Sequence, residues 1–439
     1  MKTESRVLAD SVNPIKSINL IVTMAYGRAG SIFIQSLFDG HKSIITLPYF
    51  GAMYSSIPPY VDDLDREIDT FIEKYRAIFD TSRGYFGDVG GFVAGKFGPK
   101  GDEDLRVDSG EFKSKFIDLM NKYGVDPENG RFSRKSFFIC VHIAYNKCVK
   151  DFDTGDVKYI FHNPHKHDEL QILLDDFRNL YFVAMTRDPR QDWASWKKIH
   201  AVKMGRKVEN VPAICLFLSL YKYSKASYGV SNFIDQLDRD HVRFIDLENL
   251  HILNKVAILR FCDWLQIEFE ECLLSSTFNG QQWFGNAANL KASQSFNKDM
   301  VRDAWRRELP RSDRDIIELL LNGSIEYFGY STEGEIANSK IVFDRFRYRN
   351  WISLFFHCFL YGFGSPRIVL SKQKKVFSNI KEFVWLGRKM MSPIAALLPA
   401  FGLFRQLARE ELDRRLQEIS IEQRHLSSRE RPMHLYIDR

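Results

Sequence analysis

The stretch Asn19–Gly40 reads NLIVTMAYGRAGSIFIQSLFDG and has three successive parts. Residues 19–24 are mostly apolar and long enough for one buried strand. Residues 26–31 are small, include two glycines and carry one cation, Arg28. Residues 32–38 are mostly apolar and end at an Asp-Gly pair, which is typical of a buried helix that stops at a glycine. The stretch therefore predicts a strand, a tight glycine loop and a helix.

A loop in this position is suited to binding an anion. Its backbone amides point inward, and the dipole of the following helix adds partial positive charge. Arg28 adds a full charge whose planar fork suits phosphate or sulfate oxygens. The loop is not a Walker A motif, because Gly27 and Gly30 are too close together and no lysine follows. A glycine turn without a ligand is the alternative, and on the loop alone we give the two readings equal weight.

Composition limits the classes of partner. The chain has 439 residues, of which 45% are hydrophobic, enough for a large core and two or three structural units. Its net charge of +6 lacks the dense basic stripe of a nucleic-acid binder, so we expect no nucleic-acid partner and favour anionic small ligands or an anionic membrane surface. The six cysteines form no C-x-x-C pair, which argues against zinc ribbons and redox motifs. Residues 1–14 carry no signal-peptide core, so a cytoplasmic location is the default expectation.

Further strand candidates alternate with helical segments along the chain. They are Val157–Phe161, Asn179–Thr186 and Val242–Asp246. This alternation predicts an α/β fold with a central, mainly parallel sheet flanked by helices. Ligands of such sheets bind beyond the carboxyl ends of the strands. The loops after the first strand, after Phe161 and after Thr186 should therefore open at one edge.

The sequence also predicts how the chain is divided. We expect an α/β domain over 1–340, in which 51–150 is a helical insertion that shapes the acceptor side, and a helical extension over 341–439. The apolar run Trp351–Gly364 is shorter than the ~20 residues that span a bilayer. A second apolar patch lies at Met391–Phe404, and basic residues flank both. Such a tail fits an interfacial membrane anchor or a self-association arm, and we place protein packing first.

Several motifs in correct order resemble one family, the sulfotransferases that use 3′-phosphoadenosine-5′-phosphosulfate (PAPS), especially its bacterial and carbohydrate-sulfating members. The loop Gly27-Arg28-Ala29-Gly30-Ser31 resembles the family's 5′-phosphosulfate loop. Arg187-Asp188-Pro189-Arg190 with Ser195 resembles its 3′-phosphate motif. Weaker similarities are Asp39-Gly40-His41, Leu247-Glu248-Asn249-Leu250, Ser276-Thr277-Phe278-Asn279-Gly280, Trp305-Arg306 and Gly329-Tyr330. Together they extend from about residue 18 to about residue 330, and the tail lies outside the resemblance.

The resemblance implies a P-loop sulfotransferase-like fold. It also implies in-line transfer of a sulfuryl group from PAPS to a hydroxyl or amine, with 3′-phosphoadenosine-5′-phosphate (PAP) as product. The residues implied for the 5′ end are Gly27, Arg28, Ala29, Gly30, Ser31 and Ile32. Arg187 and Ser195 would hold the 3′-phosphate, and Arg28 would stabilise charge on the bridging oxygen. Lys291 stands where members carry part of a nucleotide lid, although a solvated lysine fits equally well. We expect no metal, since no metal-ligand spacing is visible.

The general base is the weak point of the resemblance. Several members place a glutamate soon after the first helix, but here no carboxylate stands between Asp39 and Asp62. Another branch uses a histidine before the arginine strand, and the corresponding loop here holds His162, His165 and His167. His165 precedes Arg187 by 22 residues, as in that branch, so it is our first candidate and His162 the second. A related branch has Lys-Ser-Pro at 162–164, which would make His162 a sulfate contact instead.

Three functional hypotheses follow. The first is a PAPS-dependent sulfotransferase whose acceptor is a carbohydrate or glycolipid, judged from the basic apolar tail, which also allows a peripheral place on the inner membrane face. The second is a P-loop small-molecule kinase, which the missing Walker lysine and the lack of a clear Mg²⁺-binding aspartate oppose. The third is a non-catalytic nucleotide-binding or membrane scaffold, suggested by the missing glutamate.

Overall fold

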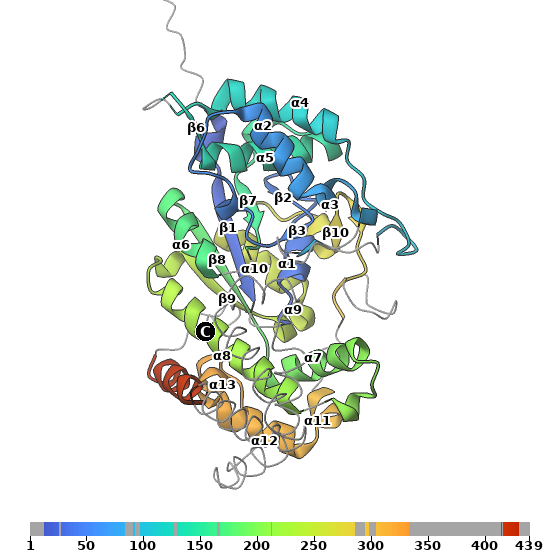
Figure 1. Cartoon of the computed structure of the whole chain (residues 1–439), viewed down its shortest axis with the longest axis vertical. Helices are drawn as coiled ribbons and strands as arrows, with labels where there is room; N and C mark the ends of the chain where they lie inside the picture. Colours follow the sequence, from blue (N-terminus) through green and yellow to red (C-terminus); the bar gives the residue numbers. More distant parts are fainter. Residues whose placement is uncertain are drawn as a thin grey trace, which may run out of the picture. The chain divides into compact units, whose positions relative to one another are not determined.

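The computed structural model describes the greater part of the chain. The described residues are 13–25, 28–83, 91–92, 97–126, 130–164, 167–211, 213–285, 295–297, 304–332, 414 and 416–429. The chain divides into two compact units. The first comprises Met1–Arg187, Gly229–Arg302 and Pro432–Arg439, and the second comprises Asp188–Tyr228 and Asp303–Arg431. Their elements are labelled in Figure 1.

A parallel sheet forms the centre of the first unit (Figure 1). In spatial order its strands are β2 (Ile44–Thr46), β7 (Tyr159–His162), β1 (Asn19–Ala25), β8 (Leu180–Thr186) and β9 (Val242–Asp246). Every neighbouring pair is parallel. The central strand β1 is apolar on both faces, as buried parallel strands usually are. The α/β fold with a mainly parallel sheet is confirmed.

The carboxyl edge of this sheet is stepped. On one side of β1, Ala25 pairs with Met185 of β8, so these strands run on together. On the other side β7 ends at His162, which pairs with Val22. At roughly 3.3 Å per residue, His162 lies about 10 Å short of the point where β1 ends. Residues that follow β7 therefore start deeper in the fold than the glycine loop.

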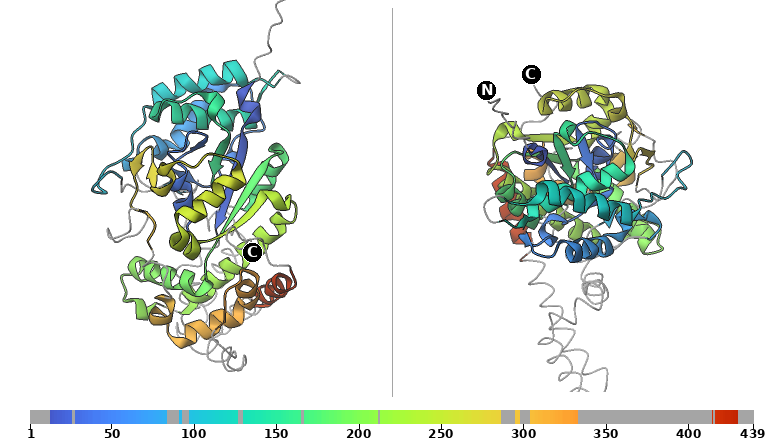
Figure 2. Two further views of the ribbon diagram at one scale, coloured as in Figure 1. Left: turned by 180° about the vertical axis from the view of Figure 1, so that it is seen from behind. Right: turned by 90° about the horizontal axis from the view of Figure 1, so that it is seen from above.

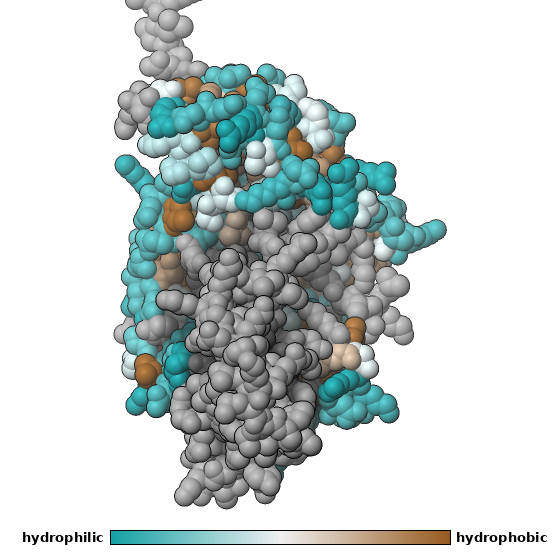
Figure 3. All heavy atoms as spheres, in the orientation of Figure 1, coloured by the Kyte–Doolittle hydropathy of each residue, from teal (hydrophilic) through white to brown (hydrophobic). Residues whose placement is uncertain are grey.

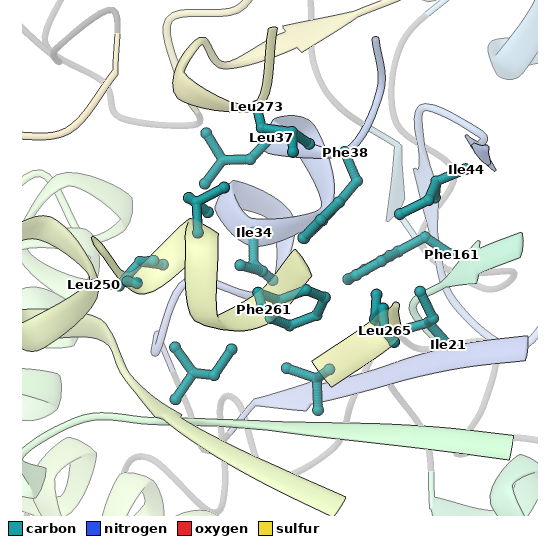
Figure 4. Close-up of a cluster of buried hydrophobic side chains, with 14 of the residues drawn as sticks. Ile21, Ile34, Leu37, Phe38, Ile44, Phe161, Leu250, Phe261, Leu265 and Leu273 are labelled. Carbon is teal, nitrogen blue, oxygen red and sulfur yellow. The ribbon is translucent and has the colours of Figure 1, made fainter. Parts of the chain in front are cut away.

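One face of the sheet is covered by α1 (Ser31–Leu37), α9 (Leu247–Leu253) and α10 (Lys255–Leu265). Figure 4 shows Phe38, Phe161 and Phe261 turned toward one another in the core between these helices and the sheet. The ring of Phe38 lies 5.4 Å from that of Phe161 and 4.6 Å from that of Phe261. The core thus fixes α1, and with it the loop that precedes α1.

Residues 51–150 are mainly helical and end in a helix that packs beside β2. Their helices are α2 (Leu64–Lys74), α3 (Arg76–Phe79), α4 (Ser109–Leu119) and α5 (Arg134–Val149). Two short antiparallel ladders join β3 (Tyr49–Phe50) to β5 (Gly91–Phe92) and β4 (Tyr60–Val61) to β6 (Phe132–Ser133). The views of Figure 2 agree that α4 lies along α5. The surface over α2 and α4 is mostly hydrophilic (Figure 3).

The other elements of the first unit are short. They are η1 (Pro14–Ser17), η2 (Tyr54–Ser56), η3 (Thr81–Arg83), the π-turn η4 (Met120–Gly124), η5 (Thr154–Asp156), α6 (His167–Asp176), η7 (Arg239–His241), η8 (Glu271–Leu274), β10 (Thr277–Phe278) and β11 (Gln281–Gln282). The strands β10 and β11 pair as a hairpin, closed by Asn279 and Gly280 with positive φ.

Helices make up the described part of the second unit. They are α7 (Pro189–Lys203), η6 (Val208–Asn210), the beginning of α8 (Ala213–Ile234), α11 (Ala304–Glu308), α12 (Arg311–Leu320), α13 (Asn322–Tyr327) and the helical segment 416–427. The segment 416–427 packs on α8, where Ser224 donates to Glu422 at 2.7 Å and Lys225 pairs with the same carboxylate at 2.6 Å. These contacts tie the segment 416–427 to α8 within the second unit.

Arg190 is the polar centre of this unit. Its side chain is 2% exposed. It donates twice to Asp188 at 2.9 and 2.7 Å, to Glu318 at 2.6 Å and to the carbonyl of Ser331 at 2.8 Å. Its guanidinium also lies 4.1 Å from the ring centre of Trp305. Because a buried charge needs this degree of satisfaction, Arg190 holds α7, α11 and α12 together.

The helical run Arg311–Tyr327 is broken at Leu321, between α12 and α13. The reason is a close approach of the segment 416–427. A Cβ on Gly323 would lie 2.1 Å from the backbone oxygen of Gln423, and the Gln423 side chain accepts from the amide of Ser324 at 2.7 Å. A glycine in a helix interior also lowers the helix propensity. The break at Leu321 therefore lies close to the residue with the weakest helix propensity in this run, Gly323.

Gly30 shows a similar close approach in the first unit. It precedes α1 with φ +86°, a left-handed conformation that only glycine adopts readily. A Cβ there would lie 2.6 Å from Cδ1 of Leu247, the first residue of α9. The absent side chain therefore allows α9 to pack on the loop.

We expect Gly30→Ala to destabilise the protein more than a control that suffers backbone strain alone. Gly130→Ala is that control, because Gly130 has φ +70° and nothing within 4 Å of the added Cβ. The strain should cost about 1 kcal/mol at either site, and the overlap with Leu247 at least about 1 kcal/mol more. Urea unfolding midpoints measure the difference. Equal losses would mean that Leu247 moves aside without strain.

Candidate functional site

The glycine loop lies at the carboxyl end of the central strand β1. Arg28 is partly exposed, whereas Ala29 is fully buried beneath it. The carbonyl of Gly30 accepts from the amide of Ile34 at 3.0 Å, which starts α1 directly after the loop. Gly27 lies outside the described residues. The described part of the loop has the strand–loop–helix arrangement that the sequence predicted.

Arg187 stands beside this loop, at the end of the adjacent strand β8. Its Nη1 donates to the backbone carbonyl of Arg28 at 3.1 Å, and its Nε donates to Glu248 Oε1 at 3.3 Å. The residue is 7% exposed. The carboxylate of the next residue, Asp188, accepts from Arg190. The structure therefore brings the two predicted cations, Arg28 and Arg187, to one edge.

Glu248 is a member of this site that the sequence did not assign. It is the second residue of α9, directly after β9, and β9 is the neighbour of β8. Asp246 caps the same helix by accepting from the amide of Asn249 at 2.8 Å. A carboxylate that follows the strand beside Arg187 was a readable signal, because adjacent parallel strands end side by side.

His251 lies one turn further along α9. Its ring stacks on Phe33 of α1 at 4.7 Å, and its Nδ1 accepts from the amide of Asn297 at 3.2 Å. Burial lowers its pKa to about 4, and the charge of Arg187 lowers it further in the same direction. His251 is therefore neutral at neutral pH and does not add positive charge to the edge.

A second polar group lies at the end of β7. The side chain of His162 is 3% exposed, and its ring packs against Phe138 and His142 of α5 at 5.1 and 6.3 Å. Its Nε2 is 3.7 Å from Oε1 of Glu169, a buried residue of α6. Within the described residues, His162 Nε2, Glu169 Oε2 and both side-chain polar atoms of Asn163 have no hydrogen-bond partner. Buried polar atoms rarely lack a hydrogen-bond partner. We infer that this end of β7 can bind a polar group.

The other predicted site residues are placed less fully. Ser31 and Ile32 open α1. Ser195 lies on α7 in the second unit and is half-buried, whereas Arg187 closes the first unit. Their joint grip on one phosphate stays a prediction. His165 and Lys291 lie outside the described residues.

The Asp39-Gly40-His41 motif forms a structural clamp. Asp39 accepts from Thr277 Oγ1 at 3.1 Å and from the amide of Gly280 at 2.9 Å, which holds the β10–β11 hairpin. His41 Nδ1 accepts from the amide of Ser43 at 3.0 Å, so its Nε2 carries the proton and donates to the carbonyl of Glu268 at 2.9 Å. Two motifs far apart in sequence thus meet at the end of α1.

Two searches of the described part of the chain gave negative results. No group of three or more His, Cys, Asp or Glu side chains there could hold a metal ion. In the same residues, we find no helix with both the length and the apolar character needed to cross a bilayer. The two apolar runs of the tail, Trp351–Gly364 and Met391–Phe404, lie outside the described residues.

No protein-family model and no curated protein matches the chain. Among solved structures, it is similar to the sulfotransferase domain from the curacin biosynthetic pathway, with 14% identity, 70% of this chain and 98% of that one covered, and a TM-score of 0.40. It is also similar to the sulfotransferase domain of the Synechococcus PCC 7002 olefin synthase, with 11% identity, coverages of 69% and 93%, and a TM-score of 0.37. A third similar structure is sulfotransferase STF9 from Mycobacterium avium, with 11% identity, 73% of this chain and 79% of that one covered, and a TM-score of 0.36.

These similar structures are bacterial sulfotransferases, the family that the motifs of this chain resemble. With identities this low and TM-scores below 0.5, the likeness carries no argument about activity. The chemistry of the site has to be argued from its residues.

The buried histidines predict how stability depends on pH. Burial lowers the pKa of His251 to about 4 and that of His142 to about 3, against ~6.5 in the unfolded chain. Between these values the unfolded chain binds more protons, so stability is lost as the pH falls below about 6.5. At about pH 5 each histidine should contribute a loss of about 2 kcal/mol relative to neutral pH. Denaturant unfolding at both pH values measures it.

His251→Asn separates the share of His251 from that of other groups. This variant removes one titrating ring, so its loss of stability on acidification should be smaller than that of the wild type by about 2 kcal/mol. The same acid loss in both proteins would show that His251 titrates alike when folded and unfolded.

Proposed function

We propose that the chain is a sulfotransferase that moves the sulfuryl group of PAPS to a hydroxyl or amine of an acceptor. The observation that carries this proposal is the contact of Arg187 with the carbonyl of Arg28 at 3.1 Å. It sets two cations from neighbouring parallel strands beside one glycine loop. PAPS carries anionic groups at both ends of its nucleoside, so a site for it needs separated positive charges of this kind.

Each cation has a distinct part in the proposed reaction. Arg28 and the loop amides would hold the phosphosulfate and stabilise the charge that develops on the oxygen between sulfur and the 5′-phosphate. Arg187 would hold the 3′-phosphate, with Ser195 as a second donor. Glu248 keeps the guanidinium of Arg187 in place through Nε. Because Arg187 is nearly buried, its attraction to a phosphate is less screened by water than that of a surface cation.

The acceptor and the location belong to the same proposal. A carbohydrate or glycolipid acceptor rests on the basic, apolar composition of 341–439. The same extension would bring the 1–340 domain to a membrane surface from the cytoplasmic side, or join it to a second copy. Residues 51–150 would form the wall on the acceptor side, since α5 packs beside β2 and β7.

Calorimetry with PAP tests the donor site. We expect PAP to bind in preference to Mg·ATP, and Arg187→Ala to weaken PAP by about 10- to 100-fold, because charge-assisted bonds to a phosphate are lost. Arg187→Lys should recover part of the loss, since it keeps the charge without the fork. Arg131→Ala is the matched control, as Arg131 pairs with Asp62 on the surface of the same unit.

The alternatives give different results in this calorimetry experiment. Preference for Mg·ATP would favour the small-molecule kinase. Binding of neither nucleotide would favour the non-catalytic scaffold.

Vesicle co-sedimentation tests the extension. A truncation at 340 would also remove the segment 416–427, which packs on α8, so charge reversal is the cleaner change. If basic residues hold the extension to lipid, Lys372→Glu, Lys374→Glu and Lys375→Glu together should reduce pelleting with anionic vesicles, at about 1 kcal/mol per charge. Neutral vesicles are the control. Unchanged pelleting would leave self-association as the role of the extension.

A further inference from the structure

The carboxyl end of β7 holds a histidine and a carboxylate that face each other inside the protein. Glu169 is fully buried at its side chain. Its Oε1 accepts from the amide of Ser55 at 3.0 Å and lies 3.7 Å from Nε2 of His162. In the described part of the chain, His162 is the only basic side chain within ion-pair distance of Glu169. Burying a carboxylate in this way is costly unless it pairs with a cation or accepts a hydrogen bond from a donor.

This arrangement fixes which nitrogen of His162 carries the proton. Nε2 faces the carboxylate, so the proton belongs there, and the lone pair of the neutral ring is at Nδ1. Nε2 itself is buried, so the exposed 3% of the side chain lies elsewhere on it. In this tautomer the ring accepts a proton at Nδ1, on the side away from Glu169, while the carboxylate stabilises the Nε2 side.

The neighbouring His142 does not compete for this role. Its Nδ1 donates to the carbonyl of Phe138 at 2.8 Å, within its own helix α5. Burial lowers its pKa to about 3, so it stays neutral beside His162. His142 therefore adds no charge that opposes the protonation of His162.

We propose that Glu169 is a positioning residue that makes His162 the general base for the acceptor. The proposal rests on the proposed sulfuryl transfer. The acceptor hydroxyl gives its proton to Nδ1 while its oxygen forms a bond to sulfur. The bond from sulfur to the 5′-phosphate oxygen breaks, and PAP leaves with that electron pair. Glu169 stabilises the imidazolium until solvent takes the proton. The gap of 3.7 Å closes to a hydrogen bond as charge develops on the ring.

His162 ends β7, the immediate neighbour of β1, which delivers the glycine loop. Its backbone lies about 10 Å short of the end of β1, so the acceptor would extend across this depth. The unpartnered atoms of His162, Asn163 and Glu169 gather at this one strand end. A pair that only braced α6 would not need to leave a carboxylate oxygen and a ring nitrogen unbonded.

Among the described residues, the titratable side chains that contact or face His162 are His142 from α5 and Glu169 from α6. Tyr54 and Tyr75 are close enough to Glu169 for its charge to raise their pKa values slightly. Burial is the larger cause and raises the pKa of Tyr75 to about 12 and that of Tyr54 beyond this range, so both stay neutral. These two tyrosines therefore do not contribute to a pH profile near neutral pH.

The experiment compares two acid-to-amide changes on one helix. Glu169→Gln removes the carboxylate that faces His162. Asp176→Asn is the matched control, because Asp176 lies on α6 too and accepts from Tyr54, so it loosens the same neighbours without facing His162. His162→Gln removes the base. The probe is the release of sulfate from radiolabelled PAPS with water as acceptor, measured across pH, with PAP affinity measured beside it.

We expect Glu169→Gln to slow sulfate release at least about tenfold and to move the rise of rate with pH to lower pH, because the ring loses its anionic neighbour. His162→Gln should abolish the rise. Asp176→Asn should keep the wild-type profile, and all variants should keep PAP affinity. The same rate and profile in Glu169→Gln and Asp176→Asn would overturn the proposal and make the pair structural.

A readout without PAPS separates this proposal from the proposed function. If the wild type neither binds PAP nor releases sulfate, the proposed function fails, and with it the catalytic role. The pair itself is then decided by NMR titration of nitrogen-labelled histidine, with the His162 signal identified by its absence in His162→Gln. A lower titration midpoint in Glu169→Gln supports the pair. An unchanged midpoint rejects it.

Discussion

The close contact between Gly30 and Leu247 is the constraint on which the candidate site depends. Because Gly30 has no side chain, Leu247 packs directly on the loop, and this places the start of α9 beside it. Glu248, the next residue, then accepts from Arg187, which also donates to the carbonyl of Arg28. The absent side chain of one glycine thus helps to orient a cation on the adjacent strand β8. Neither arginine would be held at this edge by its own strand alone.

Local pattern was enough to predict the sheet and the loop. The apolar run of 19–24 and the one that ends at Thr186 are strands because buried parallel strands carry that pattern. What the sequence could not supply were partners from distant segments. The break at Leu321 under the backbone of Gln423 and the approach of Glu169 to His162 both depend on packing between elements. No spacing rule encodes them.

Arg187 and Arg190 illustrate how one short motif can serve two purposes. Three residues apart, they have the same charge and are both nearly buried. Arg190 is enclosed by two carboxylates, a carbonyl and an indole ring, so its bonding is structural. Arg187 donates to Glu248 and to a loop carbonyl, next to the partly exposed Arg28. The two arginines look alike in the sequence, and the structure shows that they lie in different surroundings.

The alternation of side chains along β7 also bears on how such a chain can change over time. Phe161 faces the aromatic core under the glycine loop, and His162 faces α5 on the opposite side of the sheet. Substitutions in the helices of 51–150 therefore affect the face of β7 that carries His162. The opposite face, which carries Phe161, supports the glycine loop. Loss or gain of a single residue within β7 would exchange the two faces. Residues 51–150 can therefore diversify by substitution, whereas an insertion inside β7 would disrupt both faces of the strand.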